Sequence, residues 1–173
     1  MQKDRIKSKI IKAYKNKDYV LIKNAIDLKS FGLNFDFNSL LEFFNTYPSV
    51  DQQLGFKGHP FLGQIWNVVN EDTALFFSTY LVRLKDILKN TFKYNFGNLD
   101  FFFSLQGVRG GSHTDTEHVI ILGIYKNTYY HIKGKDIKIC PGDMLYISKG
   151  NIHHAFSSTE RIVLSISIWE KND

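Results

Sequence analysis

The spacing of hydrophobic residues divides the chain into two parts with different periodicity. Over residues 4–15, apolar side chains recur every three to four positions, which predicts an amphipathic helix with lysines on its other face. Similar repeats begin near Asp36 and near Asp72 and predict two more helices. The run Tyr19-Val20-Leu21-Ile22 is a candidate strand, and residues 49–63, with three glycines and one proline, are expected to form a loop.

After Tyr94 the chain changes to short runs rich in β-branched and aromatic residues, separated by Gly-, Pro- and Asn-containing turns. This pattern is typical of closely spaced strands in a barrel or sandwich. The expected strands are Leu99–Leu105, Val119–Tyr125, Thr128–Ile132, Ile137–Cys140, Met144–Ile147 and Ile162–Trp169. We therefore expect a mainly β fold with N-terminal helices, a single domain over residues 1–173. A helix-rich part at about 1–94 would buttress a β-barrel at about 95–170.

Composition and charge indicate a globular protein and argue against membrane-spanning, disulfide-bonded and nucleic-acid-binding classes. Hydrophobic residues make up 43% of the chain, a globular value, and no apolar run is long enough to span a bilayer. Cys140 is the only cysteine, so an internal disulfide is impossible and the cytoplasm is the expected compartment. Residues 1–24 hold eight Lys or Arg and two Asp, a charge of +6, and the rest of the chain carries −1, which together give the net charge of +5. A nucleic-acid partner is not expected, because the basic charge belongs to one segment.

Two short segments forty residues apart carry residues that ligate metals. His113 and Asp115 are separated by one residue, so on an extended strand both side chains point to the same face. His153 follows the predicted strand Met144–Ile147 after a short turn and supplies a third ligand. Two histidines and one carboxylate form the facial triad of non-haem Fe(II) oxygenases, which leaves positions open for substrate and dioxygen.

Other polar residues compete for places at this site. His154 can replace His153 as a ligand, and Glu117 or His118 can join as a fourth, although we favour a supporting or structural role for His118. Arg109 is a candidate for contact with substrate. The residues expected to line the substrate pocket are Ser104, Gln106, His118 and His154.

Over residues 95–170 the chain resembles the JmjC and cupin-like hydroxylases. The resemblance lies in Asn98–His113 with Asp115, in the Val119–Tyr125 strand, and in Pro141-Gly142-Asp143-Met144-Leu145-Tyr146-Ile147 followed by His153. It implies a double-stranded β-helix, also called a jelly-roll or cupin barrel. It also implies Fe(II) held by His113, Asp115 and His153, with 2-oxoglutarate and dioxygen as co-substrates.

The chain departs from this family at the residue that should hold the distal carboxylate of 2-oxoglutarate. The family usually places Lys or Arg about fifteen residues after the first ligand, where this chain has Thr128. Arg161, at the start of the last predicted strand, is the candidate replacement, because a guanidinium binds a carboxylate with two parallel hydrogen bonds. Tyr125, Thr128 and Tyr130 can add hydroxyl hydrogen bonds.

The expected function is that of an Fe(II)/2-oxoglutarate-dependent dioxygenase. Its substrate would be a protein side chain, an amino acid or a small metabolite, which the enzyme would hydroxylate. The alternative is a metal-binding cupin that is not an oxygenase, either an isomerase or a small-molecule binding protein. A third hypothesis is a barrel that only binds other proteins through its basic N-terminal helix.

Overall fold

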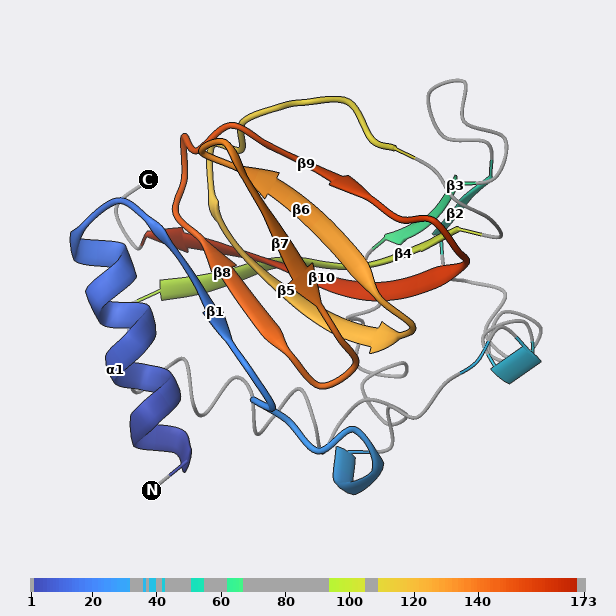
Figure 1. The fold of residues 1–173 in the computed structure, drawn as a ribbon, viewed down its shortest axis with the longest axis horizontal. Coiled ribbons are helices and arrows are strands. Elements are labelled where there is room, and N and C mark those ends of the chain that lie inside the picture. Colours follow the sequence, from blue (N-terminus) through green and yellow to red (C-terminus); the bar gives the residue numbers. More distant parts are fainter. Residues whose placement is uncertain are drawn as a thin grey trace.

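The computed structural model of the chain describes residues 2–31, 36, 38, 39, 42, 51–54, 62–66, 94–104 and 109–170. Two antiparallel sheets make up most of this part (Figure 1). The larger sheet has the order β1 (Tyr19–Ile22), β8 (Met144–Ile147), β5 (His118–Tyr125), β10 (Arg161–Glu170), β4 (Tyr94–Ser104), β3 (Leu62–Trp66) and β2 (Asp51–Leu54). The smaller has the order β7 (Lys135–Ile139), β6 (Thr128–Ile132) and β9 (His153–Phe156). This is the jelly-roll, or cupin, architecture that the sequence predicts.

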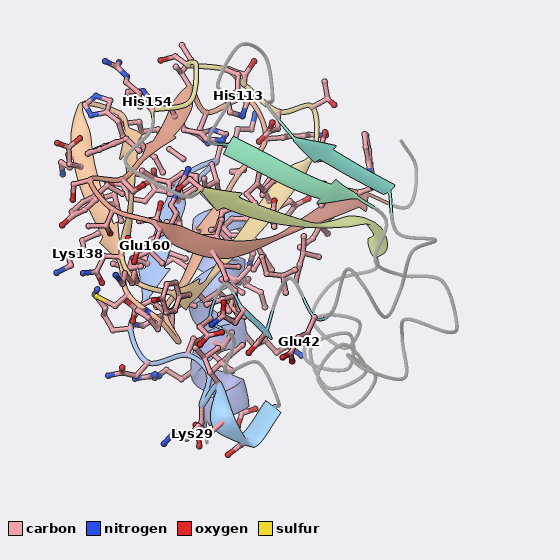
Figure 2. The ribbon with its side chains drawn as sticks, turned by 90° about the vertical axis from the view of Figure 1, so that its right-hand side faces the viewer. Lys29, Glu42, His113, Lys138, His154 and Glu160 are labelled. Carbon is pink, nitrogen blue, oxygen red and sulfur yellow. The ribbon has the colours of Figure 1, made fainter. Side chains whose placement is uncertain are left out.

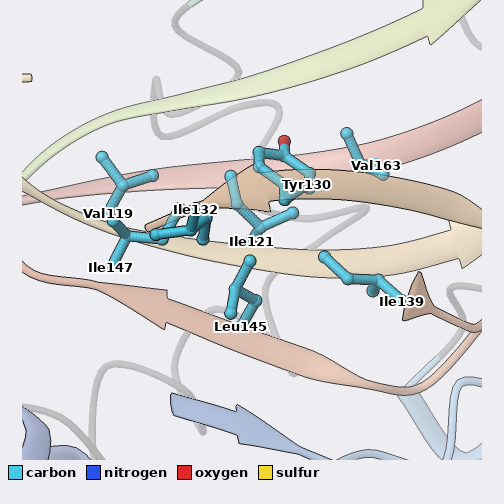
Figure 3. Packing of buried hydrophobic residues seen from close by; sticks show 8 residues of the cluster. All are labelled: Val119, Ile121, Tyr130, Ile132, Ile139, Leu145, Ile147 and Val163. Carbon is cyan, nitrogen blue, oxygen red and sulfur yellow. The ribbon is translucent and has the colours of Figure 1, made fainter. Parts of the chain in front are cut away.

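The hydrophobic core lies between the two sheets. Side chains alternate between the faces of a strand, and on β6 the residues Thr128, Tyr130 and Ile132 are buried while the two between them are half-buried. The larger sheet contributes residues of β5, β8 and β10 to the same core. The buried cluster consists of Val119, Ile121, Tyr130, Ile132, Ile139, Leu145, Ile147 and Val163 (Figure 3).

Helix α1 (Gln2–Lys15) packs beside the larger sheet and covers part of its outer face (Figure 1). Ile6, Ile10 and Ala13 are buried on one side of the helix, while lysines occupy the exposed side. The amphipathic helix predicted for residues 4–15 is confirmed and begins two residues earlier. No described helix has the length and apolar character needed to cross a bilayer.

A turn between β7 and β8 ties the N-terminal segment to the barrel. Buried Asp143 accepts hydrogen bonds from the Lys23 ammonium at 2.7 Å, the Asn24 amide at 2.9 Å and the Cys140 amide at 2.8 Å. Gly142 has a φ of +84°, and a Cβ there would lie 2.7 Å from the carbonyl oxygen of Ile26. The packing of residues 23–26 against this turn therefore requires glycine at position 142 and a carboxylate at position 143.

The structure corrects the sequence analysis in the first half of the chain. The loop expected at 49–63 is wrong in part, because Asp51–Leu54 forms β2, which pairs with β3 and through it with β4. Strand β9 was not expected at all. The helix near Asp36 is represented by residues 38, 39 and 42, and the Asp36 carboxylate accepts the Ser39 amide at 2.9 Å, as a helix cap does. The helix expected near Asp72 lies outside the described residues.

Candidate metal centre

The three predicted ligands are brought together by pairing between the segment 109–115 and strand β9. His113 and His153 form an antiparallel bridge in which each backbone amide donates to the other residue's carbonyl oxygen at 3.0 Å. The Gly150 amide donates to the carbonyl oxygen of Asp115 at 3.0 Å. Backbone hydrogen bonds therefore hold the His-x-Asp segment against the turn and strand that carry His153.

The side chains of these residues converge on one point. The Asp115 carboxylate lies 3.6 Å from Nε2 of His113 through one oxygen and 3.4 Å from Nε2 of His153 through the other. The two imidazole rings are 4.5 Å apart between centroids. Among the described residues, this is the only group of three His, Cys, Asp or Glu side chains whose ligand atoms all lie within 4.8 Å of one another.

Both imidazoles are oriented by the backbone. Nδ1 of His113 lies 3.0 Å from the carbonyl oxygen of Gly111, and Nδ1 of His153 lies 3.0 Å from that of Asn151. A carbonyl oxygen only accepts hydrogen bonds, so each Nδ1 carries the proton and each Nε2 presents its lone pair toward Asp115. Such outer hydrogen bonds fix the tautomer and direction of metal-binding histidines.

The exposed fraction differs sharply among the three side chains, and burial shifts the pKa of Asp115 and of His153. The His153 side chain is 4% exposed, Asp115 is 21% exposed and His113 is 56% exposed, so the centre opens to solvent on the His113 side. Burial raises the pKa of Asp115, against the opposing effect of the two imidazoles, and burial lowers the pKa of His153. A divalent cation would stabilise the carboxylate and the neutral imidazoles together.

The donor set fits the metal that the resemblance implies. Two imidazole nitrogens and one carboxylate oxygen, all offered from one side, match the 2-His-1-carboxylate arrangement of non-haem Fe(II) sites.

A buried cation lies deeper in the barrel. Arg161, 3% exposed, donates from Nη1 to the hydroxyl of Thr128, and its Nε has no hydrogen-bond partner among the described residues. Burial lowers the pKa of Arg161, and Tyr130 acts in the opposite direction. Ser104 faces Arg161 across the β4–β10 register, is fully buried, and its hydroxyl likewise lacks a partner there. Burying such donors costs free energy unless a ligand satisfies them.

Tyr130 lies between this cation and the triad. Its ring is 6.1 Å from that of His153 between centroids, and its pKa is raised to about 12, chiefly by burial and also by the charge of Asp115. Tyr125 is half-buried at the end of β5, with the Lys126 ammonium 5.6 Å from the centre of its ring. Gln106 lies outside the described residues.

Two histidines assigned to the pocket lie elsewhere. His118 faces α1 from the outer side of the larger sheet, where its Nδ1 is 2.8 Å from the Tyr146 hydroxyl and its ring is 5.2 Å from that of Tyr14. His154 follows His153 on β9 and points to the opposite face, stacked on His131 at 5.1 Å. Figure 2 shows His154 and His113 at the same end of the molecule. Neither His118 nor His154 belongs to the group formed by His113, Asp115 and His153.

The sequence analysis missed the two carbonyl groups that orient the ligands. Gly111 and Asn151 each stand two residues before a ligand histidine. That common spacing is visible in the sequence, but backbone carbonyls carry no residue-type signal that distinguishes them.

Several solved structures share this fold, whereas no protein-family model and no curated protein matches the sequence. The X-ray structure of Escherichia coli YcfD superposes with a TM-score of 0.69 at 15% identity, over 95% of this chain and 53% of that one. E. coli YcfD described as a ribosomal oxygenase, in complex with cobalt and succinic acid, gives 0.68 at 16% identity, with 95% and 51% coverage. A Pseudomonas putida prolyl-4-hydroxylase gives 0.67 at 10% identity, with 95% and 99% coverage.

The present chain thus spans about half the length of the YcfD chains that it matches. At these identities the comparisons establish the fold. The fold that the resemblance implies is thereby confirmed.

Proposed function

We propose that the protein is an Fe(II)- and 2-oxoglutarate-dependent oxygenase that hydroxylates its substrate. The observation that carries the proposal is the convergence of two Nε2 atoms and one carboxylate, with both Nδ1 atoms already engaged by backbone carbonyls. In this role His113, Asp115 and His153 hold the metal on one side and leave its other side accessible. Bound Fe(II), with 2-oxoglutarate and dioxygen, supplies the oxidising power needed to hydroxylate an unactivated C–H bond.

Arg161 is the residue that we propose for the distal carboxylate of 2-oxoglutarate. Its guanidinium is buried on the core side of β10 and hydrogen-bonded to Thr128, the position where the family usually has its cation. Nε of Arg161 and the hydroxyl of Ser104 are buried donors to which the described residues give no acceptor, and a carboxylate would supply one. Thr128 and Tyr130 would border the same carboxylate.

The solved structures support this assignment through their ligands and names. One YcfD structure holds cobalt together with succinic acid, a dicarboxylate one carbon shorter than 2-oxoglutarate. The neighbours described as a ribosomal oxygenase and a prolyl-4-hydroxylase point to protein side chains as substrates. We propose a protein side chain, an amino acid or a small metabolite as the substrate class, and the cytoplasm as the location.

The alternative of a four-ligand metal cupin requires Glu117 or His118 at the metal. His118 faces the helix, and Glu117 accepts hydrogen bonds from Thr116 at 2.7 Å and Ser167 at 3.5 Å. The described arrangement thus favours three protein ligands and the oxygenase.

The proposal is tested by visible absorption of the apoprotein under anaerobic conditions, on addition of Fe(II) and then 2-oxoglutarate. We expect a charge-transfer band that requires both additions, disappears in Asp115→Ala and persists in Lys126→Met, which changes an exposed residue paired with Glu160. Fe(II) binding without any band after 2-oxoglutarate would contradict the oxygenase assignment and favour a non-oxygenase cupin. Failure to bind Fe(II) would contradict both.

A further inference from the structure

An open groove lies on the outer face of the smaller sheet, next to the metal centre. It has a volume of about 670 Å³, and its lining includes Arg109, His131, Asp136, His154 and Phe156. The groove shares strand β9 with the metal centre, since His153 points inward to the triad and His154 outward into the groove. It is a separate concave surface, on the opposite face of β9 from the triad.

Three polar side chains of this groove already have side-chain hydrogen-bond partners. The Asp136 carboxylate accepts a hydrogen bond from Nδ1 of His131 at 2.6 Å, and the Ser112 hydroxyl lies 3.1 Å from Nδ1 of His154. Arg109 is exposed, and no described residue forms an ion pair or side-chain hydrogen bond with it. Asp136, the acidic residue in the groove lining, is hydrogen-bonded to His131 and not to Arg109. Arg109 therefore gives the groove a cation that can bind a carboxylate.

The groove is joined to the metal centre by a short, paired stretch of chain. Arg109 pairs with Phe156, and His113 pairs with His153, so one segment carries both the groove cation and the most exposed metal ligand. Three residue steps on β9 separate Phe156 from His153, which corresponds to about 10 Å. The centre opens to solvent on the His113 side of this segment.

We propose that this Arg109 groove binds an acidic segment of a peptide substrate while a neighbouring residue of the same peptide lies at the metal. A guanidinium is the natural partner of an Asp or Glu carboxylate. An extended peptide advances about 3.3–3.6 Å per residue, so it needs about three residues to cover the roughly 10 Å of β9 between Phe156 and His153, and more to pass from the outer face of the strand to the triad. A single amino acid is too short to occupy both places. The inference rests on the proposed function for the role of the metal, whereas peptide binding is testable without it.

The test uses metal-free, full-length protein labelled with ¹⁵N and three probes. They are the peptide acetyl-Gly-Gly-Glu-Gly-Gly-amide, the same peptide with Gln in place of Glu, and acetylglutamate amide. Titrations followed by amide chemical shifts compare wild-type protein with Arg109→Gln and with Lys126→Gln as a matched control. We expect the Glu peptide to shift amides of residues 109–114 and 154–158 and to bind at least about tenfold more tightly than the Gln peptide. Arg109→Gln should abolish this preference, and Lys126→Gln should retain it.

Three results would overturn the proposal. Equal affinity for the Glu and Gln peptides would show that carboxylate recognition is absent. An unchanged preference in Arg109→Gln would place recognition elsewhere. If acetylglutamate amide reproduced the full pattern of shifts with the affinity of the peptide, the ligand would be a small acid. Because no metal is present, these outcomes are independent of the charge-transfer band that tests the oxygenase assignment.

Discussion

Replacing Arg161 by methionine should stabilise the ligand-free protein and remove its response to 2-oxoglutarate. Arg161 is 3% exposed, and within the part of the chain that the structure describes its Nε has no hydrogen-bond partner and no carboxylate forms an ion pair with it. Burial accordingly lowers the pKa of Arg161, which means that the folded state disfavours its charge. Methionine keeps much of the side-chain length while removing the charge and the unsatisfied donor.

The magnitude follows from the state of this one side chain. A buried donor without a partner costs about 1–3 kcal/mol, and for a domain of this size 1 kcal/mol corresponds to about 2–4 °C in Tm. The Tm of the Arg161→Met variant, free of metal and co-substrate, should therefore rise by about 2–12 °C. Loss of a buried, charge-assisted partner costs about 2–5 kcal/mol of binding, so affinity for 2-oxoglutarate should fall by about 30-fold to several thousand-fold.

Scanning calorimetry of the wild type, Arg161→Met and Lys126→Met measures both effects, each with and without Mn(II) and 2-oxoglutarate. Lys126→Met removes an exposed cation and should change neither the Tm nor the response to ligand appreciably. A ligand-free Arg161→Met protein that melts below the wild type would show that Arg161 is a structural residue. Undiminished stabilisation by 2-oxoglutarate in that variant would refute its role as the anchor.

Three further predictions test the triad, the turn and the cation position. His153→Ala should weaken Mn(II) binding by more than about 100-fold in anaerobic calorimetric titration, because even outer-shell changes cost 10–100-fold; near-normal binding would refute the ligand set. Asp143→Asn should lower the unfolding free energy by about 2–4 kcal/mol in urea at pH 7. Burial alone would raise the pKa of Asp143, but its hydrogen bonds outweigh this and lower it. The difference should therefore begin to shrink below about pH 4 and be lost only as the pH falls through the lowered folded-state pKa; a difference that does not shrink in acid would contradict this cause. Thr128→Lys should destabilise the protein by placing a second cation beside Arg161, and adding Arg161→Met should restore stability; additive effects would show that the two side chains do not share one site.

The barrel strands were predictable wherever the pattern reflected burial on a sheet. The β-branched runs at Thr128–Ile132 and Met144–Ile147 form strands with the predicted bounds, because their side chains fill the core between the sheets. Strand β9 was missed because its residues, His-His-Ala-Phe, have no alternation of apolar and polar side chains. It is a strand because it pairs with β6. Likewise, β2 (Asp51–Leu54) consists mainly of polar residues, so no strand pattern is visible there in the sequence, and the strand forms by pairing with β3.

The convergence of His113, Asp115 and His153 was predictable because a metal site demands both a residue type and a spacing, and the sequence has both. The choice between His153 and His154 was open in the sequence. The structure groups His153 with His113 and Asp115 and turns His154 away, since successive residues of a strand point to opposite faces. His118 shows that closeness in sequence to a candidate ligand does not place a residue at the site. It stands three residues after Asp115, yet it lies on the outer face of the larger sheet, under α1.

The departure at Thr128 illustrates how a barrel can place a cation at the same point in space from a different strand. Arg161 and Thr128 are 33 residues apart in sequence, yet the guanidinium of one reaches the hydroxyl of the other across the barrel. Two buried cations at this point would repel each other strongly in a medium of low polarity. A small hydroxyl residue on β6 therefore suits an arginine on β10, because threonine adds no second charge and accepts a hydrogen bond from the guanidinium. The absence of lysine at 128 is, on this reasoning, an argument for an anchor on β10 and not an argument against a bound dicarboxylate.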